Sequence, residues 1–82
     1  MIFLLFELPA NNAGHRMASV WVHGDDQMLA RQQAQALLLR DGYAAAHCID
    51  AMPSTRDDYF PPCPSLDAFV VAEQEGIAVR YT

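Results

Sequence analysis

The segment from Met17 to Asp50 constrains the fold more than any other part of the chain. It contains, without a gap, an apolar run, an acidic helix start, a helix-length amphipathic stretch and a second apolar run. Short apolar runs bounded by turn residues are typical of strands, and the stretch between them has the length and pattern of a helix. The segment therefore predicts a strand, a helix and a second strand, which places the chain among mixed α and β domains.

The helix is expected over residues 27–40. Gly24 ends the preceding strand, and Asp25 is expected to be the N-cap, because its carboxylate can accept hydrogen bonds from the first free amides of the helix. Asp41 and Gly42 form the stop signal, since glycine readily adopts the left-handed conformation. The face that should contact a sheet comprises Ala30, Ala34, Leu37 and Leu38.

The first eight residues are expected to form a central strand. Apolar side chains occur on both sides of this segment, interrupted only by Glu7, so it should be covered above and below. The turn-forming residues Asn11, Asn12 and Gly14 should return the chain as an antiparallel strand over residues 17–23. The faces of that strand are expected to be Val20 and Val22 on one side, and Trp21 and His23 on the other.

A strand after the helix is expected over residues 43–50. Its alanines at positions 44–46 would allow the helix to pack closely on it. If this strand runs parallel to the strand over residues 17–23, the first strand fits between the two, as in the split βαβ arrangement.

Residues 51–64 contain four prolines and no periodicity, so they are expected to form an irregular but ordered loop. Its expected anchors are Tyr59 and Phe60, placed against a sheet face or against a neighbouring molecule. If the loop lies over the open sheet face, it covers that face within a single chain.

The last segment, residues 65–82, has two interpretations. In the preferred one, Ser65 caps a helix that Gly76 stops, and residues 77–81 form a closing strand. In the other, the two halves of the segment form a hairpin of strands. The inward residues of the preferred helix would be Leu66, Phe69 and Val70.

These elements together predict a single α+β domain over residues 1–82. The expected fold is a two-layer sandwich with a mixed four-stranded sheet and both helices on one face, in the order ββαβαβ. The alternative order, ββαβββ, ends in the hairpin. In topology alone the layout is similar to ferredoxin-like plaits, and because no motif accompanies this resemblance, it implies no functional residues.

The chain is acidic and rich in apolar residues. Ten carboxylates face five arginines, and the formal charge of −5 disfavours nucleic acid and anionic membranes as partners. No apolar run reaches the roughly 20 residues of a membrane span, and the apolar start lacks the basic residues of a secretion signal, so a cytoplasmic protein is expected. Apolar residues make up 52% of this small chain, so a second copy or another protein is expected to cover part of its surface.

Few residues could support catalysis or metal binding. The candidate catalytic residues are His23, His47 and Cys48, but His47 and Cys48 are neighbours in a predicted strand and should point to opposite faces. A metal site would have to combine His23, Cys48 and Cys63, and the chain lacks the close cysteine or histidine pairs of closed zinc sites. No cofactor is expected, because the four glycines are spread singly instead of forming a phosphate-binding loop.

The apolar excess is the stronger indication of function. It predicts a two-fold interface centred on Trp21 or Leu39. The expected function is a non-catalytic protein-interaction or ligand-binding module that self-associates, with the ligand left open. The alternative is a small enzyme whose site at a dimer interface uses His23, His47 or Cys48. The expected interface residues are Trp21, Met28, Leu39, Tyr59 and Phe60.

Overall fold

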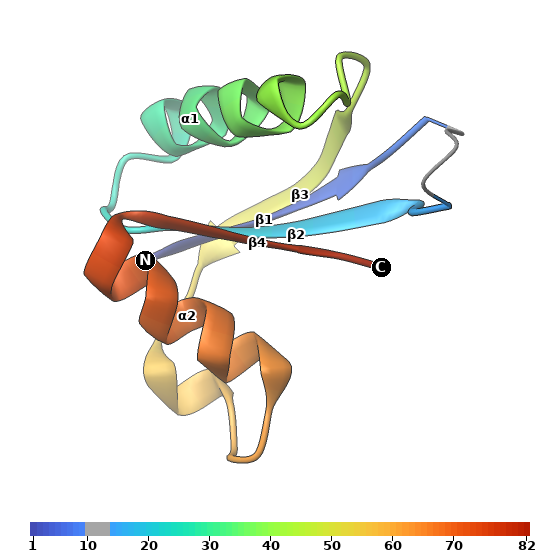
Figure 1. The fold of residues 1–82 in the computed structure, drawn as a ribbon. Helices are drawn as coiled ribbons and strands as arrows, with labels where there is room; N and C mark the ends of the chain where they lie inside the picture. Colours follow the sequence, from blue (N-terminus) through green and yellow to red (C-terminus); the bar gives the residue numbers. More distant parts are fainter. Residues whose placement is uncertain (10–13) are drawn as a thin grey trace.

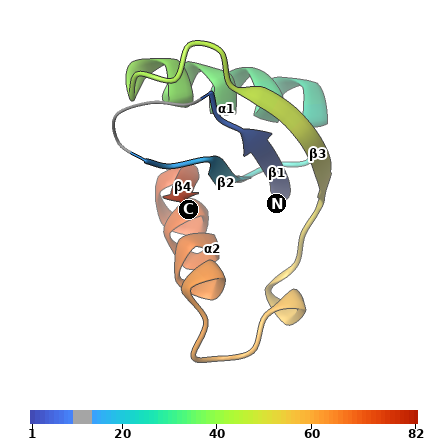
Figure 2. The ribbon, with the colours of Figure 1, turned by 90° about the vertical axis from the view of Figure 1, so that its right-hand side faces the viewer.

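Two helices lie on opposite faces of a four-stranded sheet in the computed structural model, which describes residues 1–9 and 14–82. The elements are, in chain order, β1 (Ile2–Glu7), β2 (Met17–Val22), α1 (Gln27–Arg40), β3 (His47–Pro53), the short 3-10 helix η1 (Arg56–Asp58), α2 (Pro64–Glu75) and β4 (Ile77–Tyr81). Figure 1 shows α1 on one side of the strands and α2 on the other. The view turned by 90° shows the same layering (Figure 2).

β1 lies inside the sheet, whose strand order is β3-β1-β2-β4. It pairs antiparallel with both β2 and β3, so these two strands run in the same direction with β1 between them. The predicted split arrangement is therefore confirmed. β4 pairs antiparallel with β2, so every hydrogen-bonded pair in the described sheet is antiparallel, and the expectation of a mixed sheet is wrong.

The elements follow the preferred order ββαβαβ. The alternative C-terminal hairpin is wrong, because residues 64–75 form a helix. The α+β class with four strands and two helices is confirmed, and α1 with the sheet forms two packed layers. The expectation that both helices share one face, as in a ferredoxin-like plait, is wrong, because α2 packs on the opposite face.

The two apolar faces of β1 explain why the two helices lie on opposite faces of the sheet. Leu4 and Phe6 are fully buried in the core beneath α1. Phe3 points to the other face, where its ring lies 5.1 Å from the ring of Trp21. Because successive side chains of a strand alternate between faces, β1 is protected from water on both sides only if each face has its own helix.

α1 has the predicted bounds, and its start is capped by Asp26 and not by Asp25. The Asp26 carboxylate accepts a hydrogen bond from the backbone N–H of Leu29 at 3.1 Å, which satisfies one of the free amides of the first turn. The buried residues of the helix are three of the four expected: Ala30, Ala34 and Leu38.

The C-terminal end of α1 explains why β3 begins at His47 and not at Tyr43. Gly42 has a φ of +98° and donates its N–H to the carbonyl of Leu39, while Tyr43 donates its N–H to the carbonyl of Leu38. This pair of bonds is the Schellman motif, in which the residue after the glycine packs back on the last helical turn. Tyr43 is buried with Leu38 in the same core cluster, so it completes the helix end and cannot also start the strand.

α2 covers the sheet face that contains Trp21, the one tryptophan of the chain. Trp21 is only 1% exposed and packs with Phe69 and Ala72 of α2. Its indole N–H donates a hydrogen bond to the Tyr59 hydroxyl at 3.0 Å. The segment before α2 therefore reaches back over Trp21, which is covered within a single chain.

The start of α2 and the loop before it differ in part from the prediction. α2 begins at Pro64, with Cys63 instead of Ser65 as the N-cap, and Gly76 ends it in the left-handed conformation as predicted. The loop predicted over residues 51–64 is shorter, because β3 extends to Pro53 and η1 forms within it. Of the turn residues expected between β1 and β2, Gly14 has a φ of +77°, whereas Asn11 and Asn12 lie outside the described residues.

Replacing Leu38 with alanine tests the packing of α1. Leu38→Ala should lower the free energy of unfolding by about 2–5 kcal/mol, because a fully buried side chain would leave a cavity between α1 and the sheet. The neighbouring control, Leu39→Ala, removes a side chain that is 60% exposed and should change the free energy by less than about 0.5 kcal/mol. Urea unfolding followed by circular dichroism measures both, and equal losses would contradict the observed orientation of α1.

Replacing Tyr59 with phenylalanine tests the cover over Trp21. The hydroxyl of Tyr59 lies 3.0 Å from the Trp21 indole nitrogen and 3.1 Å from the Ser54 hydroxyl oxygen. Tyr59→Phe should therefore lower the free energy of unfolding by about 1–3 kcal/mol, because it leaves a buried donor without its partner. The control is Phe60→Leu at a site that is 83% exposed, where no measurable loss is expected. Urea unfolding followed by tryptophan fluorescence measures both, and a Tyr59→Phe variant as stable as the wild type would contradict this cover.

Candidate functional site

β4 presents one side of its backbone to solvent. Within the described sheet it is an edge strand, hydrogen-bonded to β2 alone. The carbonyl of Gly76 accepts from the N–H of His23, and the N–H of Thr82 donates to the carbonyl of Met17, so the even-numbered residues face β2. Because bonding direction alternates along an antiparallel strand, the backbone N–H and C=O groups of the odd-numbered residues point away from the sheet. These residues are Ile77, Val79 and Tyr81.

A groove, which we call the β4 groove, runs along this edge. Its volume is about 650 Å³, and it is bordered by β4 and by residues of α1 and α2, including Leu37 and Val71. A second hollow of about 460 Å³ adjoins it at the start of β4 and shares Leu37 and Ile77 with it. The helices therefore form two walls, and the open strand edge lies between them.

The β4 groove is lined by apolar side chains and by charged side chains that sum to no net charge; we call the charged residues its rim. Its apolar side chains include Leu37, Val71 and Val79. Its charged side chains are two arginines and two carboxylates, so the formal charge of −5 lies entirely outside the groove. The charged residues of the rim are Arg40, Asp67, Glu75 and Arg80.

The opposite edge of the sheet is built differently. In β3, Cys48 and Asp50 pair with consecutive residues of β1, so Ile49 is an extra, bulged residue in this strand. The strand also ends in Pro53, which has no N–H to donate. Bulges and prolines are common devices that prevent edge-to-edge pairing, and β4 contains neither. β4 is therefore the edge better suited to accept another strand.

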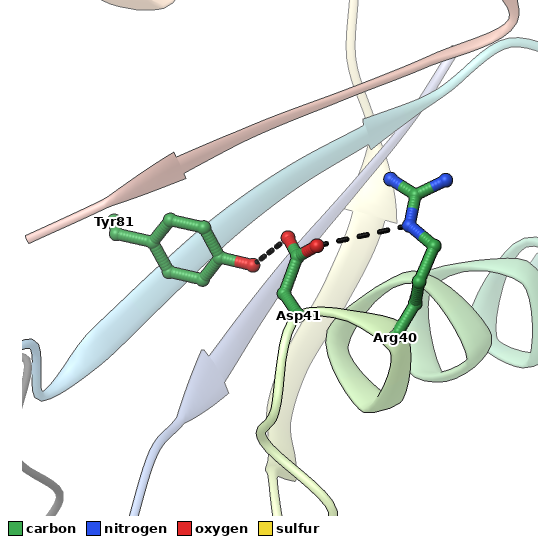
Figure 3. A network of polar contacts seen from close by, with 3 residues as sticks. All are labelled: Arg40, Asp41 and Tyr81. Atoms are coloured by element: carbon green, nitrogen blue, oxygen red, sulfur yellow. Dashed lines mark hydrogen bonds and ion pairs between the residues drawn. The ribbon is translucent and has the colours of Figure 1, made fainter.

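A polar contact fixes the α1 wall of the groove to the end of β4. The Tyr81 hydroxyl donates to the Asp41 carboxylate, which lies 3.7 Å from the Arg40 guanidinium, as Figure 3 shows. The Tyr81 ring also lies 5.1 Å from the ring of Tyr43. Burial, followed by the hydrogen bond to Asp41 and the negative charge of that group, raises the pKa of the Tyr81 phenol above its ordinary value.

The candidate catalytic residues do not meet. His23 follows β2 at the end where Val22 pairs with Ile2, whereas His47 pairs with Glu7 at the other end of β1. The length of β1 separates these two ends by roughly 16 Å, at about 3.3 Å per residue. Cys48 lies next to His47 in β3, and its thiol contacts the carbonyl of Asp50 at 3.4 Å. These three side chains therefore form no common site.

The metal candidates are also dispersed. Cys48 packs against the core beneath α1, while Cys63 occupies the N-cap position of α2 on the other side of the sheet. His23 is exposed beside the start of α1. Among the described residues, no group of three or more histidine, cysteine or carboxylate side chains is placed to hold a metal ion.

The expected interface residues divide into buried and exposed ones. Trp21 belongs to the core of the chain and is not a surface residue, and Tyr59 is half-buried as its hydrogen-bond partner. Met28 and Leu39 on α1 and Phe60 in the loop are exposed. The β4 groove was not predicted from the sequence. The available signal is that the segment Ile77–Tyr81 contains no proline and only one charged residue, Arg80, so its composition gives an edge strand little protection.

Comparisons with protein-family models, with curated proteins and with solved structures gave no match to this chain. In the described part of the chain, neither helix is long and apolar enough to cross a membrane.

The contact between Tyr81 and Asp41 predicts a pH dependence of stability. The folded state holds the phenol in its neutral form, since its pKa is raised there. The resulting stabilisation is present below the unfolded pKa of about 10 and is lost as the pH rises above that value. The free energy of unfolding should therefore fall more steeply above this pH in the wild type than in Tyr81→Phe. Urea titrations at several alkaline pH values measure the difference, and parallel curves would contradict it.

Proposed function

We propose that this protein is a non-catalytic protein-interaction module that binds an extended segment as an additional strand at β4. The observation that carries the proposal is the open edge of β4, with its outward backbone groups lying in an apolar groove between two helices. Main-chain hydrogen bonds to such an edge supply affinity, and contacts on alternate sides supply specificity.

The two walls of the β4 groove predict what kind of segment it accepts. One side of an added strand would face Leu37 of α1, and the other would face Val71 of α2. Successive side chains of the bound strand point to opposite sides, so the side chains that face α1 and those that face α2 should both be small or apolar. A segment with few charges also fits the balanced rim of the groove.

The enzyme alternative has weaker support. It would require at least two of His23, His47 and Cys48 to converge on one concave site, and the sheet places the histidines at opposite ends of β1. The β4 groove contains none of the three.

Proline at position 79 tests strand addition. Val79→Pro removes an N–H that points away from β2, so the bonds between β2 and β4 should survive while an added strand loses a donor. The matched control, Val79→Ile, retains this N–H. A displayed library of short random peptides should yield ligands for the wild type and the control. In these ligands, both the odd-numbered and the even-numbered positions should carry mainly apolar residues. The same ligands should bind Val79→Pro at least about tenfold more weakly.

Circular dichroism melting of all three proteins confirms that each is folded before binding is compared. Peptide ligands that bind Val79→Pro as tightly as the wild type would contradict strand addition at this edge. A library that yields no ligand for the wild type, together with a wild-type protein that forms no complex through β4, would contradict the proposed function as a whole.

A further inference from the structure

We infer that the β4 groove is filled by a second copy of the same chain, with the two β4 strands paired antiparallel about a two-fold axis at Val79. This inference rests on the proposed function and adds to it the identity of the partner. Pairing of the two β4 strands joins two four-stranded sheets into one continuous sheet, with the helices of both copies on its faces.

The hydrogen-bonding pattern of β4 is symmetric about Val79. The outward backbone groups belong to Ile77, Val79 and Tyr81, which are evenly spaced around that residue. In an antiparallel pair, Val79 would lie opposite the partner's Val79, and Ile77 opposite the partner's Tyr81. Each of these is a pair that exchanges both N–H···O=C bonds, so every outward group of β4 finds a partner.

The charges of the rim are complementary in this register. Glu75 ends α2 directly before β4, and Arg80 lies near the other end of the strand, where its guanidinium contacts the Ser65 hydroxyl at 3.5 Å. Reversal by the two-fold axis places Arg80 opposite the partner's Ala78, three residues along the chain from the partner's Glu75. The same contact occurs twice, so two cations meet two carboxylates across the interface.

The distribution of charge and apolar surface favours this face over others. The formal charge of −5 makes two copies repel each other at most orientations, but the β4 groove has no net charge. Pairing also brings Leu37 and Val71 of each copy toward the same residues of its partner, which removes apolar side chains of the groove from water. An isologous contact of this kind closes on itself as a dimer.

Charge reversal at two positions tests the register. In Arg80→Glu each of the two symmetric contacts would join two carboxylates, and in Glu75→Arg each would join two guanidinium groups. Each variant alone should self-associate at least about tenfold more weakly than the wild type in sedimentation velocity, because both symmetric contacts become repulsive. An equimolar mixture of the two should recover association. In the mixed dimer, the carboxylate introduced at position 80 of one variant meets the guanidinium introduced at position 75 of the other, and the remaining contact is the original pair of charges.

Other outcomes separate this inference from the proposed function. Single variants that associate as tightly as the wild type, or a mixture that shows no recovery, would overturn the two-fold register. Association that persists in Val79→Pro but is lost in Leu39→Glu would place the interface on the outer side of α1 and overturn it as well. A wild type that remains monomeric into the millimolar range, while its peptide ligands still lose affinity for Val79→Pro, would overturn self-pairing and leave the proposed function intact.

Discussion

The structure depends on one strand that is apolar on both of its faces. β1 places Ile2, Leu4 and Phe6 on one side and Phe3 on the other, and it has a hydrogen-bonded neighbour at each edge. Burying a large apolar side chain stabilises a protein by about 1.5–3 kcal/mol, so leaving either face of β1 in water would remove much of the stability available to so small a domain. The two helices are therefore needed on opposite faces, and one layer of helices would not suffice.

The placement of the two helices on opposite faces of the sheet determines where the molecule can bind another chain. α1 packs on one face of the sheet, and α2 packs on β2 and β4 on the other. Unpaired backbone groups of the strands remain at the edges of the sheet. At the β3 edge, the bulge at Ile49 and the terminal Pro53 interrupt a regular row of donors and acceptors. At the β4 edge, the row is regular and is flanked by Leu37 and Val71 on the two helices. The same arrangement that protects β1 thus gives β4 both an open backbone and apolar walls.

The parts of the fold that could be predicted are those determined by local signals. α1 has its predicted bounds because an aspartate cap and a glycine stop bracket it, and β4 begins where Gly76 ends α2. β3 is predicted to begin at Tyr43, because the alanines that follow it would let a helix pack closely on a strand. Tyr43 instead forms part of the Schellman motif at the end of α1, so β3 begins at His47. On the face that α2 occupies, Trp21 contacts Tyr59 and α2, which are far from it in the sequence, so no local pattern reveals this packing.

The candidate site could not be predicted from the sequence for a related physical reason. A groove between α1, α2 and β4 exists only once the strand order is known, and the segment Ile77–Tyr81 gives no sign by itself that it lies at an edge. The apolar excess predicts an interface centred on Trp21 or Leu39; α2 covers Trp21 within the chain, whereas Leu39 is exposed. A chain of 82 residues buries only roughly 60 to 65 percent of the surface of its unfolded form. Adding a strand at β4 increases that fraction without a larger core, because it extends layers that the single chain has already built.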